Sequence, residues 1–317
     1  MTLLSAFPLT PLRDHGSAVD ADAFARLVRR LPGSGAAEIG VLGSTGIYPY
    51  LSRDERRRVV ETAAAEAGGL PLTVGIGALT TREVMAAAAD AQEAGAAALL
   101  LAPVSYHPLT EREVWTLFSD VAAGTDVPLV IYDAPRTTGF TFSDALLARL
   151  GQLPAVTAVK SPAVAGGVTE AAARLATLCG LFPQGTRIGV SGDALAGPFV
   201  AAGADVWYSA MAGTLPHAMA SLMAAARPQS ATSPEATPRA ATAGENEVGD
   251  PGGWERLEPL WRLTARHGGA VRVATAIALY LGLVGPDSLP RPLLPLQEED
   301  QAEVVAVVTA LGLLDGE

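Results

Sequence analysis

The residue with the most distinctive chemistry is Lys160, because it is the only lysine in the chain. Lysine and arginine together number 22, so the other 21 basic side chains are arginine. Arginine replaces lysine in solvation and in most ion pairs, but it cannot lose its proton and act as a nucleophile. A lone lysine is therefore either a nucleophile that the chain has kept or a chance survivor in a sequence that favours arginine.

The residues before Lys160 favour the first interpretation. Ala155–Val159 is a short apolar run of the kind that forms a buried strand, and Lys160 follows it directly. Burial disfavours the charged form of an amine, and a neutral amine can attack a ketone to form a Schiff base. The structural alternative is a lysine that caps the strand and pairs with an acid, but no acid adjoins it in sequence.

Hydroxyl groups follow two other apolar runs. Gly43-Ser44-Thr45-Gly46 offers two hydroxyls and a series of backbone N–H groups in a tight turn, which suits a carboxylate or another small anion. Its simpler interpretation is a plain strand-to-helix turn. Tyr132 ends another run, and its phenol could relay protons to and from a substrate, although a lone tyrosine is more often a packed core residue.

The remaining reactive side chains have simpler interpretations. His15 and His107 fall in loops and are expected to face solvent, with a second acid–base role as the alternative. Cys179 is expected to be buried packing, and Asp193 is interpreted as a helix N-cap.

The elements that must position these residues follow a repeated pattern of short apolar runs and longer amphipathic segments. The runs are rich in Val, Leu and Ile and lack period-two alternation, which is typical of strands buried on both faces. The eight predicted strands are Leu4–Leu9, Ala36–Leu42, Pro71–Ile76, Ala97–Ala102, Pro128–Tyr132, Ala155–Val159, Thr186–Val190 and Asp205–Met211. The predicted helices between them include Ser52–Ala67, Thr80–Ala94, Thr110–Ala122, Ser143–Leu150 and Ala194–Ala202.

Helix signals agree with this division. Ser52 with Glu55, Thr80 with Glu83 and Thr110 with Glu113 have the spacing of capping boxes. Eight strand–helix units predict an α/β fold, a (β/α)8 TIM barrel, in which the active site lies at the carboxyl ends of the strands. An open doubly wound sheet is the alternative, and it would be expected to show a glycine-rich turn after its first strand, which Phe7–Arg13 lacks.

The pattern divides the chain into three parts. Residues 1–226 are predicted to form the barrel. Residues 227–253 are rich in Pro, Ser, Thr, Ala, Gly and Glu and predict a flexible insertion or linker. Residues 254–317 predict a helical C-terminal region with helices at Trp254–His267, Ala270–Leu283 and Gln297–Leu313, and with Pro286–Pro295 as an extended connection.

Composition limits the function classes. The formal charge is −11, so a partner with a phosphate backbone is disfavoured and we expect no nucleic-acid binding. One cysteine and four scattered histidines give no disulfide framework and no spacing typical of a metal site. No secretion signal and no uninterrupted stretch of 18 apolar residues is evident, so we expect a cytoplasmic protein without a membrane partner.

Several motifs carry a resemblance to a known family when they are taken together. Gly43-Ser44-Thr45-Gly46 follows the second predicted strand, Tyr132-Asp133-Ala134-Pro135 the fifth and Val159-Lys160-Ser161 the sixth. Phe7–Thr10, Val190–Asp193 and Arg291–Leu293 match further elements in the same order. This arrangement resembles the dihydrodipicolinate synthase / N-acetylneuraminate lyase family over most of the chain.

The resemblance implies a class I, Schiff-base lyase or aldolase that acts on small molecules and usually forms a tetramer. It implies that Lys160 forms an imine with pyruvate or another 2-oxo acid and that Tyr132 handles protons. Ser44 and Thr45, in the turn that ends at Gly46, would hold the carboxylate, with Ser44 also relaying protons. Gly189 and Tyr208 would line the pocket near the imine. An iminium itself withdraws electrons, so this chemistry needs no metal or organic cofactor.

Departures from the family pattern lie on the side of the second substrate, an aldehyde. Ile47 stands where the synthase has Glu, and Val104 and Ser105 stand where it has paired tyrosines. Tyr106 comes one position later, while Arg136 comes one position early and leaves Thr137 at the matched place. Tyr106, Arg136 and Thr137 remain candidate substrate-binding residues, but a guanidinium moved by one residue loses its bidentate geometry.

These departures predict weak or no condensation of pyruvate with aspartate semialdehyde. They indicate a less polar acceptor pocket, suited to a hydrophobic or aromatic aldehyde. Three alternatives stay open: a Schiff-base dehydratase of a sugar acid, a non-catalytic regulatory relative, and a phosphate-binding barrel enzyme. The last would use Ser191–Asp193 and Ala212–Thr214 as anion sites, but it leaves the single lysine unexplained.

Overall fold

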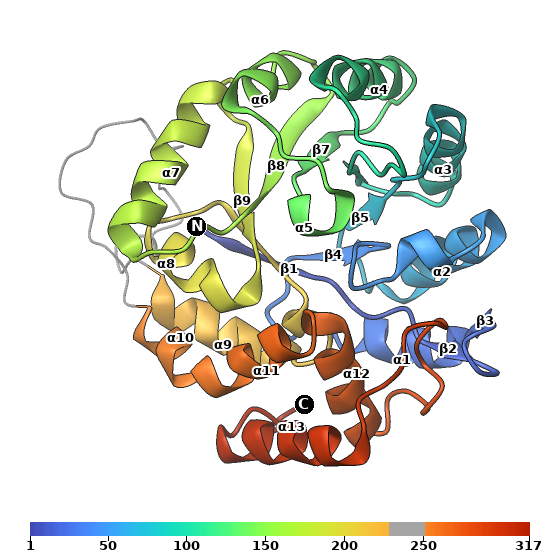
Figure 1. The fold of residues 1–317 in the computed structure, drawn as a ribbon, viewed down its shortest axis with the longest axis vertical. Helices are drawn as coiled ribbons and strands as arrows, with labels where there is room; N and C mark the ends of the chain where they lie inside the picture. Colours follow the sequence, from blue (N-terminus) through green and yellow to red (C-terminus); the bar gives the residue numbers. More distant parts are fainter. Residues whose placement is uncertain (228–250) are drawn as a thin grey trace.

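The barrel predicted from the sequence is present in the structure. The computed structural model describes residues 1–227 and 251–317. Eight parallel strands close in the order β1-β10-β9-β8-β7-β6-β5-β4, and helices ring them (Figure 1). The strands are β1 (Leu3–Ala6), β4 (Glu38–Val41), β5 (Leu72–Gly75), β6 (Ala98–Leu101), β7 (Leu129–Tyr132), β8 (Val156–Pro162), β9 (Arg187–Ser191) and β10 (Val206–Ser209). Each of the eight predicted strands overlaps one of these, which confirms the fold class.

Three helices of the ring begin at the predicted capping signals, Ser52, Thr80 and Thr110. They are α1 (Ala21–Arg29), α2 (Arg53–Glu66), α3 (Thr81–Glu93), α4 (Glu111–Ala123), α6 (Asp144–Leu150), α7 (Val168–Leu181), α8 (Ala196–Ala201) and α9 (Pro216–Ala226). Ser52 and Thr110 form complete capping boxes with the glutamates three residues on. Thr80 caps the N–H of Glu83, but the Glu83 carboxylate accepts from the Thr80 hydroxyl rather than from its backbone. A small hairpin, β2 (Leu12–Arg13) with β3 (Ala18–Val19), and the short helix α5 (Pro135–Thr138) lie outside the repeated strand–helix pattern and were not predicted.

Alternate residues of each strand face the barrel interior, as the pleat of a strand requires. The interior cluster includes Phe7, Leu100, Val130, Ala158 and Tyr208, while a larger cluster fills the space between the strands and the helices. Ala158 and Lys160 are two residues apart on β8. The lysine side chain therefore shares the inward face of that strand.

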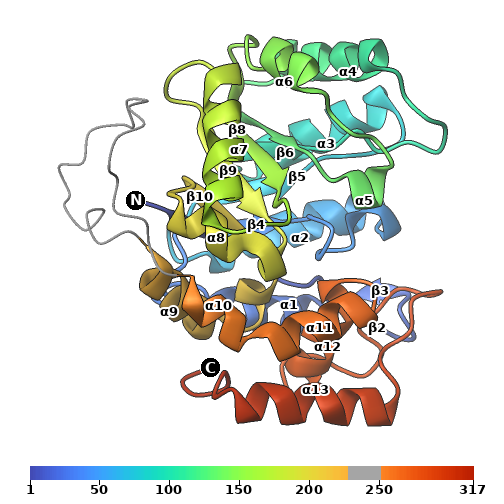
Figure 2. The same ribbon diagram turned by 60° about the vertical axis from the view of Figure 1, so that its left-hand side comes forward.

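The C-terminal region is helical, with α10 (Gly252–Arg256), α11 (Glu258–Arg266), α12 (Ala270–Tyr280) and α13 (Glu298–Ala310). Figure 2 shows α11, α12 and α13 together on one side of the barrel, near α1. The single helix predicted at Trp254–His267 is wrong, because it divides at Leu257. Pro259 stands in the first turn of α11 and has no N–H to donate to the preceding turn, which accounts for the break. Residues 228–250, most of the predicted flexible insertion, lie outside the described residues.

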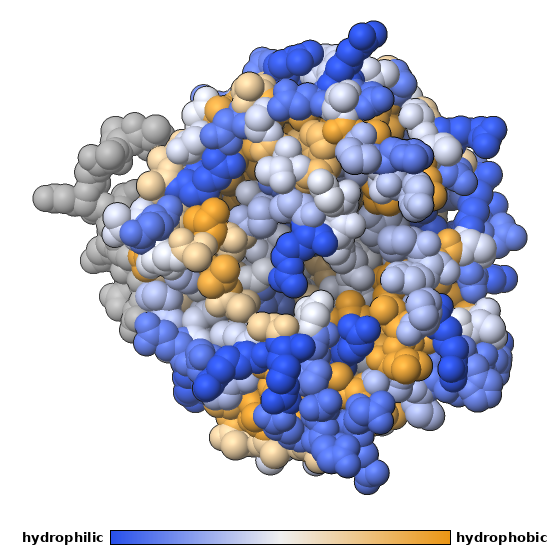
Figure 3. All heavy atoms as spheres, in the orientation of Figure 1, coloured by the Kyte–Doolittle hydropathy of each residue, from blue (hydrophilic) through white to orange (hydrophobic). Residues whose placement is uncertain are grey.

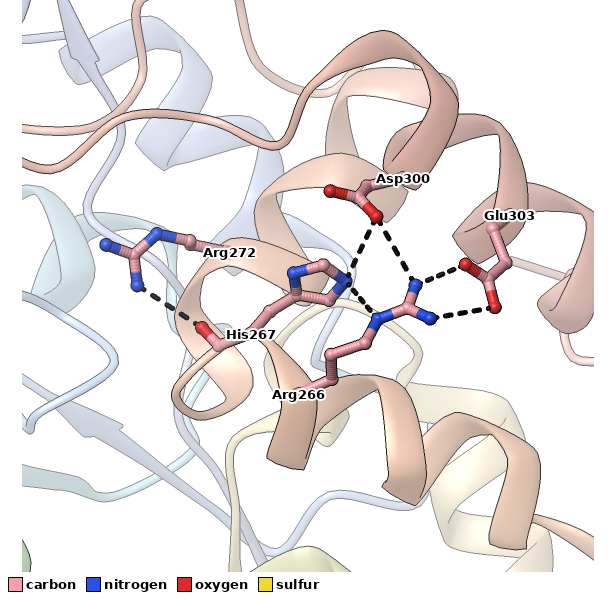
Figure 4. A network of polar contacts seen from close by, with 5 residues as sticks. All are labelled: Arg266, His267, Arg272, Asp300 and Glu303. Atoms are coloured by element: carbon pink, nitrogen blue, oxygen red, sulfur yellow. Dashed lines mark hydrogen bonds and ion pairs between the residues drawn. The ribbon is translucent and has the colours of Figure 1, made fainter.

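Ion pairs join the end of α11 to α13 (Figure 4). The Arg266 guanidinium donates to Glu303 and to Asp300, and His267 lies 3.8 Å from the same Asp300 carboxylate. Arg272 of α12 donates to the His267 carbonyl oxygen at 3.2 Å. The side chains of Arg266, Asp300 and Glu303 are 40–49% exposed, so their ion pairs orient the helices more than they stabilise them.

Asp193 and two tryptophans connect the barrel to this region. Asp193 accepts from Trp207 Nε1 of β10 at 3.2 Å, and its carbonyl oxygen accepts from Trp254 Nε1 of α10 at 2.7 Å. The two indole rings are 4.8 Å apart. The interpretation of Asp193 as an N-cap is wrong: the carboxylate is buried, and Gly192 precedes the 3₁₀ turn that Asp193 begins. Among the described residues, no helix is long and apolar enough to cross a membrane.

Candidate active site

The register of three neighbouring strands brings the predicted site residues together. Tyr132 of β7 pairs with Lys160 of β8, and Lys160 pairs with Gly189 of β9. Strand β8 continues to Pro162, so Lys160 lies inside the strand rather than just after it. The three positions therefore lie side by side near the carboxyl end of the barrel, where (β/α)8 enzymes build their sites. Figure 3 shows this face hollowed at its centre, with hydrophilic side chains around and across the hollow.

The Lys160 amine is enclosed by aromatic rings. Lys160 is 5% exposed, and its Nζ lies 4.0 Å from the ring centre of Phe7, 4.3 Å from that of Tyr132 and 5.4 Å from that of Tyr208. No carboxylate among the described residues forms an ion pair with it, so the structural alternative of a strand-capping ion pair is absent from this part of the chain. An amine held by ring faces stays available to a carbonyl carbon, because no hydrogen-bond acceptor has to be displaced first.

Gly189 and Tyr208 form the wall beside the lysine. A Cβ on Gly189 would stand 2.3 Å from Cε2 of Tyr208, so only glycine at this position lets the phenol ring lie across β9. Tyr208 is fully buried, and burial raises its pKa well above the usual value. Its phenol therefore stays neutral and shapes the pocket.

Ser44 reaches Tyr132 across the mouth of the barrel. The hydroxyls of Ser44 and Tyr132 share a hydrogen bond of 3.0 Å. Ser44 owes its place to a sharp turn, in which Leu42 has the left-handed φ of 56° and Ile47 donates its N–H to the Ser44 carbonyl oxygen at 3.1 Å. Thr45 is buried in the same turn, and Gly46 packs against the Leu42 backbone. The structure thus places a hydroxyl pair and a tight turn opposite the amine.

Three predicted substrate-binding residues are not held at this centre. Tyr106 is 88% exposed and packs against His107. Arg136 and Thr137 are exposed on α5, where the Thr137 hydroxyl donates to the Ala134 carbonyl oxygen at 3.1 Å. No hydrogen bond or ion pair among the described residues fixes the Arg136 guanidinium.

The proposed phosphate sites are occupied by the protein's own atoms. The Asp193 carboxylate accepts from the Met211 N–H at 2.9 Å, and burial raises its pKa. A Cβ on Gly213 would stand 2.3 Å from the Phe7 carbonyl oxygen, so this glycine backs directly onto the first strand. A carboxylate at one position and a carbonyl at the other repel an anion, which counts against the phosphate-binding interpretation.

Sequence reasoning missed Phe7 as a site residue. It directly follows β1 and begins the Phe7–Thr10 motif, and its ring lies against both Lys160 Nζ and, edge to face, Tyr208. Its position directly after the first strand of a barrel could have marked Phe7 as a candidate, because the strand ends converge on the site.

Asp133, which follows Tyr132, has an environment that makes stability depend on pH. It is 6% exposed, its Oδ1 has no partner among the described residues, and burial, opposed by the charge of Arg174, raises its pKa to about 6. The unfolded chain binds this proton with an ordinary pKa of about 3.9. The protonated Asp133 carboxyl therefore contributes stability to the folded state. That contribution is fully present below about pH 4 and is lost as the pH rises through about 6.

We expect Asp133→Asn to stabilise the protein at pH 7.5 relative to the wild type. The gain should exceed the gain at pH 4.5 by about 1 kcal/mol, because the pKa difference is worth about 2 kcal/mol over this pH range and partial hydration of the carboxylate reduces it. Denaturant unfolding of both proteins at the two pH values measures this difference. An equal effect at both pH values would show that Asp133 is not a buried, unpaired carboxylate.

A closed barrel with an amine, a phenol and a hydroxyl converging at the carboxyl ends of its strands is the framework of an aldolase-type lyase. A sequence model described as the Dihydrodipicolinate synthetase family matches residues 1–311, and the chain belongs to this family.

Relatives with named activities support the same assignment. The 4-hydroxy-tetrahydrodipicolinate synthase of Methanothrix thermoacetophila is 28% identical over 310 residues, which cover 98% of this chain and 96% of the relative. That of Nitrobacter hamburgensis is 34% identical over 223 residues, 68% of this chain and 71% of the relative. Among solved structures, dihydrodipicolinate synthase from Agrobacterium tumefaciens has 42% identity and a TM-score of 0.86, with 98% of each chain covered.

Proposed function

We propose that the protein makes or breaks a carbon–carbon bond between a 2-oxo acid, with pyruvate as the first candidate, and an aldehyde, through a Schiff base on Lys160. The observation that carries this proposal is the Lys160 amine, buried among three aromatic rings without an ion-pair partner in the described part of the chain.

The proposed reaction begins at the amine. Lys160 Nζ adds to the keto carbon, and the keto oxygen takes two protons, one from Nζ and one from an acid group of the site, and leaves as water to form the iminium. Loss of a proton from the neighbouring methyl or methylene carbon gives an enamine. The enamine carbon attacks the aldehyde carbon, and the new alkoxide takes a proton. Water then hydrolyses the iminium and restores the amine.

Tyr132 is the proposed proton carrier for these steps, because its ring lies 4.3 Å from Nζ and its hydroxyl is bonded to Ser44. A positioned acid–base group contributes about 10²–10⁴-fold to the rate. Ser44 and Thr45 are the proposed ligands of the 2-oxo acid carboxylate, with backbone N–H groups of the turn up to Gly46. The single turn would then bind the substrate and relay its protons.

The direct test is reductive trapping. The wild-type protein is incubated with pyruvate and with a panel of other 2-oxo acids, reduced with borohydride and measured by intact-mass spectrometry. We expect one adduct per chain with at least one of these acids. Absence of an adduct with every acid would overturn the proposal and leave a non-catalytic relative as the better interpretation.

The aldehyde partner is the less defined part of the proposal. The named relatives are 4-hydroxy-tetrahydrodipicolinate synthases, whereas the proposal for this chain is an aldehyde other than aspartate semialdehyde. Ile47 is buried, Val104 faces the interior cluster, and Arg136 is exposed without a partner in the described residues, so no fixed cation receives a second carboxylate.

We expect hydrophobic or aromatic aldehydes to be turned over with a kcat/KM at least about tenfold above that of aspartate semialdehyde, since a missing charge-assisted pair is worth about 1.5–3 kcal/mol. A coupled assay of pyruvate consumption with matched aldehydes measures the ratio. Robust turnover of aspartate semialdehyde, or of anionic aldehydes alone, would contradict this expectation.

The protein is further proposed to act as a homo-oligomer. Tyr50, Leu79 and Tyr106 are apolar, 50%, 65% and 88% exposed, and follow the adjacent strands β4, β5 and β6. Exposed apolar side chains on neighbouring loops are typical of a surface that meets another copy.

A further inference from the structure

Arg56 is a half-buried cation that the proposed mechanism does not use. It lies near the N-terminus of α2, and its Nε is buried with no hydrogen-bond partner among the described residues. No carboxylate in the described part of the chain forms an ion pair with it, since Asp90 of α3 binds Arg53 instead, at 2.7 and 2.8 Å. A charge taken out of water without a counter-ion costs free energy, and a cation is disfavoured at a helix N-terminus. A side chain kept at such a cost is a candidate for a functional role.

The guanidinium binds the end of strand β5. Its two Nη atoms donate to the carbonyl oxygens of Gly75 and Gly77, each at 3.0 Å. Gly75 is the last residue of β5, and Gly77 lies two positions further on. The planar fork of one arginine therefore holds two carbonyl groups of the same strand end, which a single ammonium is less suited to do.

These carbonyl groups need a donor because strand β4 leaves the sheet beside them. The register between β4 and β5 ends one residue before Leu42, whose left-handed φ of 56° turns the chain away. The Ile76 N–H donates to β6 at 3.0 Å, and the Gly75 carbonyl of the same trans peptide points the opposite way, toward β4. Arg56 thus supplies a donor on the side from which β4 has departed.

The segment from Leu42 to Arg56 is consequently fixed to β5 at both ends. At its start, a Cβ on Gly75 would stand 1.9 Å from the Leu42 carbonyl oxygen, so the two backbones are in direct contact. At its end, the two hydrogen bonds of Arg56 hold it. Ser44 lies within this segment and shares its 3.0 Å hydrogen bond with the Tyr132 hydroxyl. Hydrogen bonds, a backbone contact and two peptide links therefore connect the guanidinium to that hydroxyl without a gap.

We propose that Arg56 is a positioning residue for proton transfer: its hold on the end of β5 fixes the turn that carries Ser44 and keeps the Ser44 hydroxyl on Tyr132. This rests on the proposed Schiff-base function, in which Tyr132 carries protons at the imine. Arg56 itself neither touches the amine nor forms a bond with substrate. Its effect is on the geometry of the hydroxyl pair, and so on the rate at which protons move.

The test compares Arg56→Met with Arg58→Met, a matched control that removes an exposed arginine from the same helix. Methionine keeps an apolar stem and removes the donors. Imine formation with a saturating concentration of the 2-oxo acid that the wild type traps is followed by rapid quenching into borohydride, in H₂O and in D₂O. We expect Arg56→Met to form the imine about tenfold more slowly, with a larger solvent isotope effect. Arg58→Met should match the wild type in both quantities.

Chemical rescue separates the donor fork from simple packing. Methylguanidinium is added to Arg56→Ala, in which the side chain has been removed, and the rate of imine formation is measured again. We expect a rise of at least about threefold. Methylammonium at the same concentration should have no effect, because it carries the charge without the planar pair of donors.

The outcomes distinguish this proposal from the one on which it rests. A wild type that traps no 2-oxo acid removes the Schiff-base function itself. If the wild type traps, an Arg56→Met rate within twofold of wild type and an unchanged isotope effect overturn the role of Arg56 alone. So would an equal loss in Arg58→Met, which would show a general effect of charge. If neither Arg56→Met nor Arg56→Ala folded, Arg56→Lys makes the same comparison of rate and isotope effect, with the adduct located at Lys160 by peptide mapping.

Discussion

Lys160→Arg is expected to abolish adduct formation with every 2-oxo acid and to lower turnover by at least about 10³-fold, because the guanidinium keeps its proton and cannot add to a ketone. Arginine keeps a long apolar stem, so its contacts with the rings of Phe7, Tyr132 and Tyr208 are largely retained. The variant therefore removes nucleophilicity with little change in packing.

A control that restores the lysine elsewhere makes the result specific. In the double variant Lys160→Arg, Arg187→Lys, the chain again has one lysine, now at the start of β9, where it faces Glu38 at the opposite end of the barrel. Intact mass after borohydride reduction should show no adduct in either variant. An adduct that survived Lys160→Arg would place the reacting amine at the N-terminus and would remove Lys160 from the mechanism.

Gly75→Ala is expected to be the most destabilising glycine-to-alanine substitution in the barrel. A Cβ on Gly75 would stand 1.9 Å from the Leu42 carbonyl oxygen and 2.7 Å from its carbonyl carbon, so one backbone would have to move away from another. Leu42 holds the left-handed φ of 56° that starts the turn carrying Ser44. We expect a loss of about 3 kcal/mol in the free energy of unfolding, together with at least about tenfold lower turnover, as Ser44 moves off Tyr132.

Denaturant unfolding and the trapping rate measure the two effects. Gly180→Ala in α7 is the matched control, because no atom lies within 4 Å of its Cβ and alanine favours a helix by about 0.5–1 kcal/mol. The expectation would be contradicted if Gly75→Ala kept the wild-type free energy of unfolding and the wild-type trapping rate. The turn after β4 could then shift without disturbing Ser44.

Most of the fold could be predicted because buried parallel strands and helix caps are local signals. The eight apolar runs, and the glutamate three residues after Ser52 or Thr110, carry their information within a few positions. The break at Leu257 was also local, but helical periodicity on both sides of Pro259 concealed it. Boundaries that depend on packing, such as the continuation of β8 through Lys160 to Pro162, were missed.

The candidate site residues also divide into those that local sequence signals predicted and those that depend on packing. Lys160, Tyr132 and Ser44 were found because strand ends of a barrel converge, and the register confirms that Lys160, Tyr132 and Gly189 are neighbours. The contact of Phe7 with the amine depends on where its ring turns after the backbone leaves β1, which spacing alone does not fix. Asp193 looks like an N-cap from its short polar side chain, yet the indole N–H that it binds comes from a different strand.

The Asp193 junction has an optical consequence. Its two indole rings, one on the last barrel strand and one on the first helix after the barrel, are close enough for their excited states to couple. That coupling exists only while the two parts of the chain are docked. Near-ultraviolet circular dichroism of the unlabelled protein therefore reports on docking.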